Sequence, residues 1–151
     1  MVIGIGMDMT KLFSVLVGLF FVNLAVAQQS DLAVTVTGIA DDTGSVVVAV
    51  FDSEDNWLST KVGTPAFLDV SREVNGETEM SFLIEDILAG NYALSIFHDV
   101  NANGELDANF IGYPKEPFGF SAPMGSFGPP SFIQASIVVK PGLNKISIAI
   151  D

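Results

Sequence analysis

The chain has 151 residues, which is enough for one domain. It carries 18 acidic against 6 basic residues, a net charge of −12, and this excludes nucleic acid and anionic membrane surfaces as partners. It contains no cysteine, which excludes disulfides and a lipid-modified N-terminal cysteine. Cations and basic partners remain open.

An apolar run over residues 12–27 follows Lys11 and ends on Ala25-Val26-Ala27, a small-x-small cleavage site. The run is too short for a comfortable membrane span. We therefore expect a signal peptide over 1–27 and a mature domain over 28–151. The protein would be exported, to the periplasm or the cell exterior, with no membrane association beyond the signal peptide. An uncleaved N-terminal anchor is the alternative.

The mature part consists of short β-prone runs between turn residues, and no stretch sustains helical spacing. Apolar and polar residues alternate on both sides of Asn75-Gly76, a favoured hairpin turn. This predicts an antiparallel hairpin over Phe67–Ile84 with Met80, Phe82 and Ile84 buried. We expect an all-β fold, a single antiparallel β-sandwich of about seven strands. The seven expected strands are Leu32–Ile39, Ser45–Phe51, Phe67–Val74, Glu77–Ile84, Asn91–Asp99, Gln134–Lys140 and Leu143–Ile150.

The stretch from Ile111 to Ser131 is too rich in proline to be an interior strand. A loop of this length in a small domain is usually functional or internally organised. Its aromatic rings either cover an open end of the sandwich or line an apolar patch or groove for a ligand or protein partner. The rings that we assign to this candidate surface are Phe110, Tyr113, Phe118, Phe120 and Phe127.

The segment from Asp99 to Asp107 has the spacing of a calcium loop, with oxygen-bearing side chains at positions 1, 3, 5 and 9 and glycine at position 6. Alternate residues of a tightly curled loop point at one centre, where their oxygens suit a hard divalent cation. Position 12 is Phe110 rather than a bidentate Glu, so the segment is not an EF-hand, and Glu116 or a more distant acid would have to close the site. Calcium is the cofactor that this spacing predicts, and an Asx turn is the alternative. The expected ligands are Asp99, Asn101, Asn103, the carbonyl group of Glu105, and Asp107.

His98 is the only histidine, so any Ser-His-Asp chemistry would depend on it. It is in phase with Leu94 and Ile96 on the inward face of a strand, which predicts a core residue; a supporting role beside Asp99 is the alternative. No nucleophile elbow, zinc-binding His pair or phosphate loop is present. We expect a non-enzymatic binding or docking module for an extracytoplasmic protein or ligand. The alternatives are a carboxylate-dependent hydrolase or carbohydrate-active enzyme and a purely structural envelope module.

Five short motifs occur in order along the mature chain: Leu88-Ala89-Gly90-Asn91-Tyr92, His98-Asp99, Gly112-Tyr113-Pro114-Lys115-Glu116, Phe118-Gly119-Phe120-Ser121 and Gly128-Pro129-Pro130-Ser131-Phe132. This series resembles a family of bacterial exported proteins catalogued as domain of unknown function 2141. The first motif is also similar to one in transthyretin-like and carboxypeptidase-regulatory-like sandwiches. The resemblance implies export and a β-sandwich, and it supplies no catalytic residue.

Overall fold

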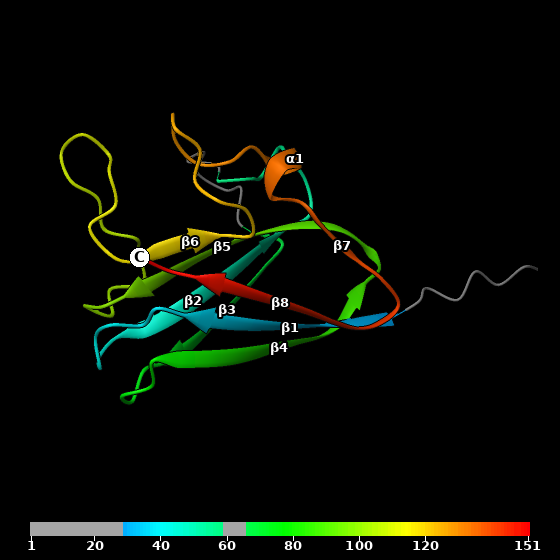
Figure 1. Ribbon diagram of the computed structural model, residues 1–151, viewed down its shortest axis with the longest axis horizontal. Helices are drawn as coiled ribbons and strands as arrows, with labels where there is room; N and C mark the ends of the chain where they lie inside the picture. Colours follow the sequence, from blue (N-terminus) through cyan, green and yellow to red (C-terminus); the bar gives the residue numbers. More distant parts are fainter. Residues whose placement is uncertain (1–28, 59–65) are drawn as a thin grey trace, which may run out of the picture.

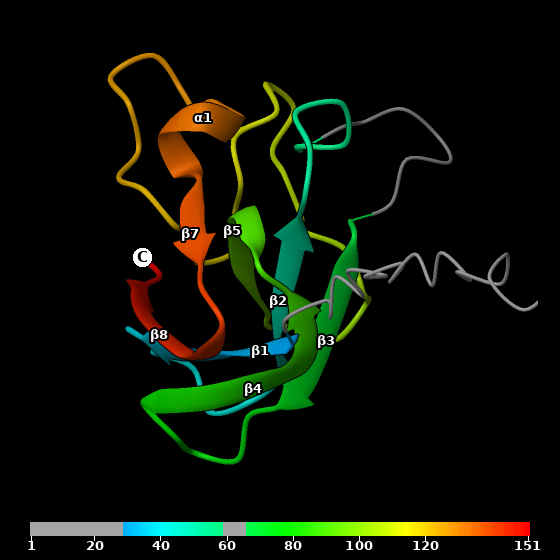
Figure 2. The ribbon, with the colours of Figure 1, turned by 90° about the vertical axis from the view of Figure 1, so that its right-hand side faces the viewer.

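The computed structural model describes residues 29–58 and 66–151; the expected signal peptide, and with it the anchor alternative, lies outside the described residues. These residues contain eight strands and one short helix. The strands form two facing sheets, and the strands of one sheet cross those of the other at a steep angle (Figures 1 and 2). No helix in the described ranges is long and apolar enough to cross a membrane. The elements are β1 (Gln29–Thr37), β2 (Ser45–Phe51), β3 (Leu68–Glu73), β4 (Glu79–Leu88), β5 (Gly90–Asp99), β6 (Phe118–Phe120), α1 (Phe132–Ala135), β7 (Ile137–Val139) and β8 (Gly142–Ala149).

One sheet has the strand order β4-β1-β8, and the other has β3-β2-β5-β6 with β7 also paired to β5. The predicted β-sandwich is confirmed. One pair departs from the antiparallel pattern, because β1 and β8 run parallel with Val34 opposite Ile146. This pairing brings the last strand beside the first.

The predicted hairpin over Phe67–Ile84 is wrong in its pairing, although Met80, Phe82 and Ile84 are buried as expected. β3 pairs with β2, whereas β4 pairs with β1 in the opposite sheet. The chain still turns at Gly76, which has φ +85°, but the turn leads from one sheet to the other. Alternation determines which face of a strand is buried, and it does not determine which strand lies alongside.

The core lies between the two sheets and is built from the inward residues of the alternating strands. β1 contributes Leu32, Val34 and Val36. β4 contributes Met80, Phe82 and Ile84 and, after a break in the alternation, Ile87. His98 follows the same alternation in β5 and is fully buried, which confirms its expected place in the core.

Two elements differ from the expectation. Strand β6 lies in the proline-rich stretch, where no regular element was expected, and helix α1 overlaps the start of an expected strand. β6 is a strand of three residues that follows Pro117, and it pairs with β5. Helix α1 replaces the beginning of the expected strand Gln134–Lys140. Ser131 caps this helix in a capping box with Gln134, which favours a helical turn after the two prolines.

Candidate functional site

The acidic loop, defined here as residues 99–107, begins at the last residue of β5. Asp99 is only 3% exposed, and its carboxylate accepts hydrogen bonds from the backbone N–H groups of Asn103 (3.0 Å) and Gly104 (2.7 Å). Gly104 has φ +83°, which supplies the left-handed turn that brings these donors round to Asp99. Asp99, the first residue of the calcium-like motif, therefore holds the curled backbone of the loop through two hydrogen bonds.

A second buried carboxylate holds the two ends of the loop together. Glu116 is 8% exposed and accepts hydrogen bonds from the backbone N–H groups of Val100 and Asp107, both at 2.9 Å. Sequence spacing suggested Glu116 as a residue that closes the site. The structure places it at the loop, where it binds the backbone.

The remaining motif side chains converge on Asp107. Its carboxylate accepts hydrogen bonds from the side-chain amides of Asn101 (2.8 Å) and Asn103 (3.3 Å). The carbonyl oxygens of these same amides accept the backbone N–H groups of Asn103 (3.0 Å) and Glu105 (2.8 Å), which are Asx-turn contacts. N–H donors thus compensate the carboxylates of Asp99 and Asp107. Within residues 29–58 and 66–151, no group of three or more His, Asp or Glu side chains could hold a metal ion.

His98 lies one residue before this loop, and its ring faces the turn at residues 41–44. The Nε2 atom is 2.7 Å from the carbonyl oxygen of Thr43, while the buried Nδ1 has no hydrogen-bond partner among the residues that the structure describes. Gly44 packs so closely against the acidic loop that a Cβ atom there would meet the carbonyl group of Asp99 and lie 2.7 Å from Cα of Val100. The histidine and the glycine therefore fix the base of the loop.

The aromatic rings separate into a packed group and an exposed group. Trp57, from the segment after β2, contacts Phe51 edge-on at 5.1 Å, Phe120 at 5.9 Å and Phe132 at 6.4 Å between ring centroids. Its indole N–H donates to the carbonyl oxygen of Pro130 at 2.9 Å. The packed rings join the segment after β2 to β6 and to the start of α1.

The exposed group consists of rings that project from the loops into solvent. Phe110 is 99% exposed, Phe127 is fully exposed and Tyr113 is 58% exposed. Tyr113 contacts Phe118, and Phe118 contacts Phe120, with ring centroids 6.2 Å and 5.7 Å apart. This series of rings leads from the exposed group to the packed one.

A groove of about 720 Å³ lies between the acidic loop and the proline-rich stretch. It is lined by both segments, by Ser95 of β5 and by Leu58 after β2. Among residues 29–58 and 66–151, no charged residue lines it. The lining includes Leu58, Leu106, Tyr113, Phe118, Phe120 and Met124. Its size and apolar lining are those of sites that bind small molecules or partner side chains.

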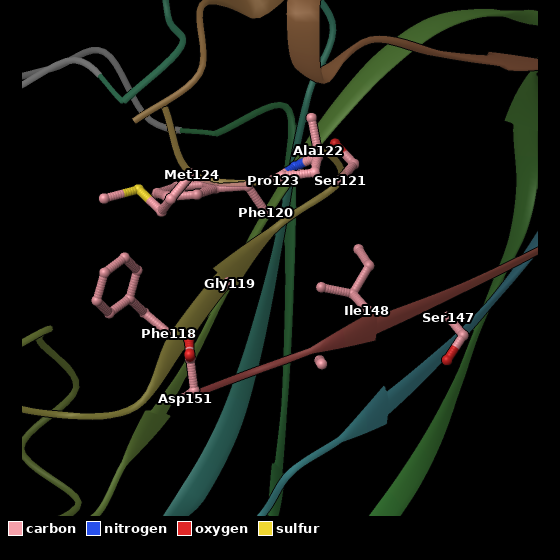
Figure 3. Close-up of a pocket in the computed structure, with 11 residues that line it drawn as sticks. Phe118, Gly119, Phe120, Ser121, Ala122, Pro123, Met124, Ser147, Ile148 and Asp151 are labelled. Atoms are coloured by element: carbon pink, nitrogen blue, oxygen red, sulfur yellow. The ribbon is translucent and has the colours of Figure 1, made fainter. Parts of the chain in front are cut away.

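A second cavity, of about 430 Å³, opens between β6 and β8 (Figure 3). Phe118, Phe120 and Met124 line both this cavity and the groove. On the other side lie Ile148 and the C-terminal Asp151, whose backbone pairs with that of Phe118. These shared side chains couple the two cavities.

Among the five predicted aromatic residues, the groove is lined by Tyr113, Phe118 and Phe120, while Phe110 and Phe127 project beyond it. Sequence reasoning missed Leu58, Leu106 and Met124 as groove residues. Leu106 had a visible signal, because it occupies the aliphatic position 8 of the calcium-like motif. Leu58 and Met124 are isolated apolar residues in irregular segments and had none.

Comparison with known protein families gives one match. The model of a family described as "Uncharacterized protein conserved in bacteria (DUF2141)" matches residues 34–147. No curated protein and no solved structure matches the chain. The matched range includes the acidic loop and all the rings of the groove.

Proposed function

The chain belongs to the DUF2141 family of uncharacterized bacterial proteins, and from this premise we propose that it is an exported, non-enzymatic binding module whose ligand site is the apolar groove. The observation that carries the proposal is the groove itself, at about 720 Å³, with aromatic walls and two exposed phenylalanines beyond its lining. Contiguous exposed apolar surface of this kind marks interaction sites on soluble proteins.

The groove offers an apolar ligand a large apolar contact surface and few polar or reactive side chains. Ser95 and Ser126 are the only side-chain hydroxyl groups of its lining apart from Tyr113. Glu116 and His98, two of the three residues whose clustering around an open cleft would favour a hydrolase, are both buried, and neither lines the groove. Their hydrogen bonds go to backbone atoms, so neither group is presented to a bound molecule. The third residue, Asp107, does not line the groove either. This geometry favours binding over hydrolysis.

Binding of the neutral apolar dye Nile red to the purified protein tests the groove. We expect dye fluorescence to rise on binding and the affinity to fall at least about fivefold, near 1 kcal/mol, in a Tyr113→Ala variant that removes one wall. Leu83→Ala is the matched control, since Leu83 is 55% exposed on β4 and does not line the groove. Equal losses in the two variants, or no dye binding, would reject the groove as a ligand site.

We further propose calcium as a stabilising ligand of the acidic loop, which adjoins the groove through Leu106. The support is the convergence of Asn101, Asn103 and Asp107 within hydrogen-bond distance of one another. A cation beside Asp107 would replace the two amide N–H groups that its carboxylate now accepts, and the amides would turn their oxygens toward the ion. Oxygen ligands from carboxylates and amides are those that calcium prefers.

Thermal unfolding with calcium and with chelator tests this second proposal. Mass action predicts a stabilisation of about 2.7 kcal/mol at a hundredfold excess of calcium over the dissociation constant. Asp107→Asn should abolish it, because the amide keeps the shape and removes the charge. Asp69→Asn, on the exposed face of β3, should retain the stabilisation. An unchanged melting temperature in millimolar calcium would leave the loop as an Asx turn.

A further inference from the structure

The segments that line the groove also carry charged residues, which lie outside the lining and are mostly of one sign. Leu58 closes a segment that carries Asp52, Glu54 and Asp55, and all three are exposed. Leu106 lies between Glu105 and Asp107. Against these five carboxylates, the described segments 52–58, 99–107 and 108–131 contribute one base, Lys115. The uncharged apolar groove is therefore lined by segments that carry a surplus of negative charge.

The apolar surface extends past the groove. Phe110 and Phe127 do not line it, yet they are 99% and 106% exposed at the tips of the two loops that border it. Each such ring has on the order of 150–250 Å² to bury. A small molecule confined to the groove would leave both rings in water, whereas the surface of a protein partner could cover them as aromatic anchors.

From this pattern we infer that the groove binds a cationic apolar segment of another exported protein: aliphatic or aromatic side chains that enter the groove, flanked by Lys or Arg residues that face the carboxylates. This inference rests on the proposed function and names the partner of the same site. A second copy of this chain does not fit, because pairing through this face would oppose two acidic rims in a molecule of net charge −12.

Fluorescence anisotropy with three short synthetic peptides tests the inference on the purified protein. All three share one Leu-Phe core, and the core is flanked by Lys, by Gln or by Glu. We expect the Lys peptide to bind at least about tenfold more tightly than the Gln peptide at low salt, with the Glu peptide weakest, and the preference to shrink as salt screens the charges. Nile red displacement in the same titration reports whether a peptide occupies the groove.

Two variants locate the contact. Phe110→Ala combined with Phe127→Ala should weaken the Lys peptide at least about tenfold, because interface aromatics contribute strongly when they are covered. Leu83→Ala is the matched control, and it should leave the affinity unchanged. Both phenylalanines are fully exposed, so their removal leaves the core intact.

The outcomes separate the inference from the proposal on which it rests. Equal affinity for the Lys and Gln peptides, or displacement by neither while Nile red still binds, would overturn the cationic protein partner and leave a ligand groove. A Lys-peptide affinity that is insensitive to the phenylalanine variants would also overturn it, as attraction to a generally acidic protein. Failure of both dye and peptides to bind would reject the groove altogether.

Discussion

At the scale of single residues, two buried carboxylates organise the acidic loop. Asp99 and Glu116 each accept two backbone N–H groups, so four donors of the curled loop are satisfied by charged acceptors. Sequence spacing predicted that the motif side chains would gather. The Asx-turn alternative includes backbone donors at Asp99. Backbone donors at Glu116 were not predicted, because the path of a loop backbone is not visible in residue spacing.

Glu116→Gln should destabilise the fold by about 1.5–3 kcal/mol, since hydrogen bonds to a charged group are the stronger ones and an amide can accept at only one of its two positions. Equilibrium unfolding in urea measures the loss. Glu105→Gln is the control, because Glu105 is exposed and surface substitutions usually change stability by less than about 0.5 kcal/mol. Equal stability of the two variants would show that Glu116 does not tie the loop.

Gly44 and Gly76 offer a matched pair for the packing of the loop on its neighbouring turn. Their φ angles are nearly equal, at +82° and +85°, but only at Gly44 would a Cβ atom meet other atoms, the backbone of Asp99 and Val100. Gly76→Ala should cost about 1–2 kcal/mol from the left-handed backbone alone. Gly44→Ala should cost roughly 1–3 kcal/mol more, from the forced displacement of the loop.

Urea unfolding of both alanine variants provides the comparison. Closely similar losses at the two positions would mean that the acidic loop yields easily and is not held against the turn at residues 41–44.

At the scale of elements, the alternation of apolar and polar residues predicted which side chains are buried better than it predicted which strands pair. It placed Met80, Phe82 and His98 in the core correctly. It predicted a hairpin where the chain crosses between sheets, because β2 and β1 compete for the strands that flank Asn75-Gly76. Strand β6 was missed for another reason: with three residues and a preceding proline, it is too short to show any period.

The proline-rich stretch is held by contacts that no periodic pattern reveals. Ser121 Oγ accepts the backbone N–H of Leu94 at 2.8 Å and donates to the carbonyl oxygen of Ala135 at 2.6 Å, which links β5 to α1. Trp57 joins the same region from the other side through Phe120 and Pro130. These contacts join the stretch to β5, to α1 and to the segment after β2.

Trp57→Phe should lower stability by about 1–3 kcal/mol, because the carbonyl group of Pro130 loses its donor. It should also weaken Nile red binding, since Phe120 lines the groove and packs on the indole ring. Urea unfolding and dye titration measure the two effects separately. A stability loss with unchanged dye affinity would show that the tryptophan supports the sandwich and not the groove.

At the scale of the whole molecule, the net charge follows from the composition, whereas the groove depends on how the chain folds. Apart from Ser95, the uncharged groove residues lie on the segments 52–58, 99–107 and 108–131. The same segments carry the carboxylates considered above. The composition gives the net charge of −12, from which no nucleic-acid partner is expected. The meeting of Leu58 and Leu106 in one groove depends on the topology, because the two residues are far apart in sequence.

The boundary of the mature protein is a prediction at this scale. Strand β1 begins at Gln29 and its second residue, Ser30, is already buried. Cleavage after Ala27 would therefore leave every described element intact and remove none of the core. We expect protein recovered from an exporting bacterial host to begin at Gln28, and intact-mass measurement checks this.

Two substitutions make the test specific for the small-x-small site. Ala27→Leu places a large residue where the peptidase requires a small one, so this variant should keep its leader and remain with the membrane fraction. Val26→Leu changes the neighbouring unrestricted position and should be processed like the native chain. Retention of residues 12–27 in the native protein would instead identify an N-terminal anchor, and the groove would then act at a membrane surface rather than on a freely diffusing module.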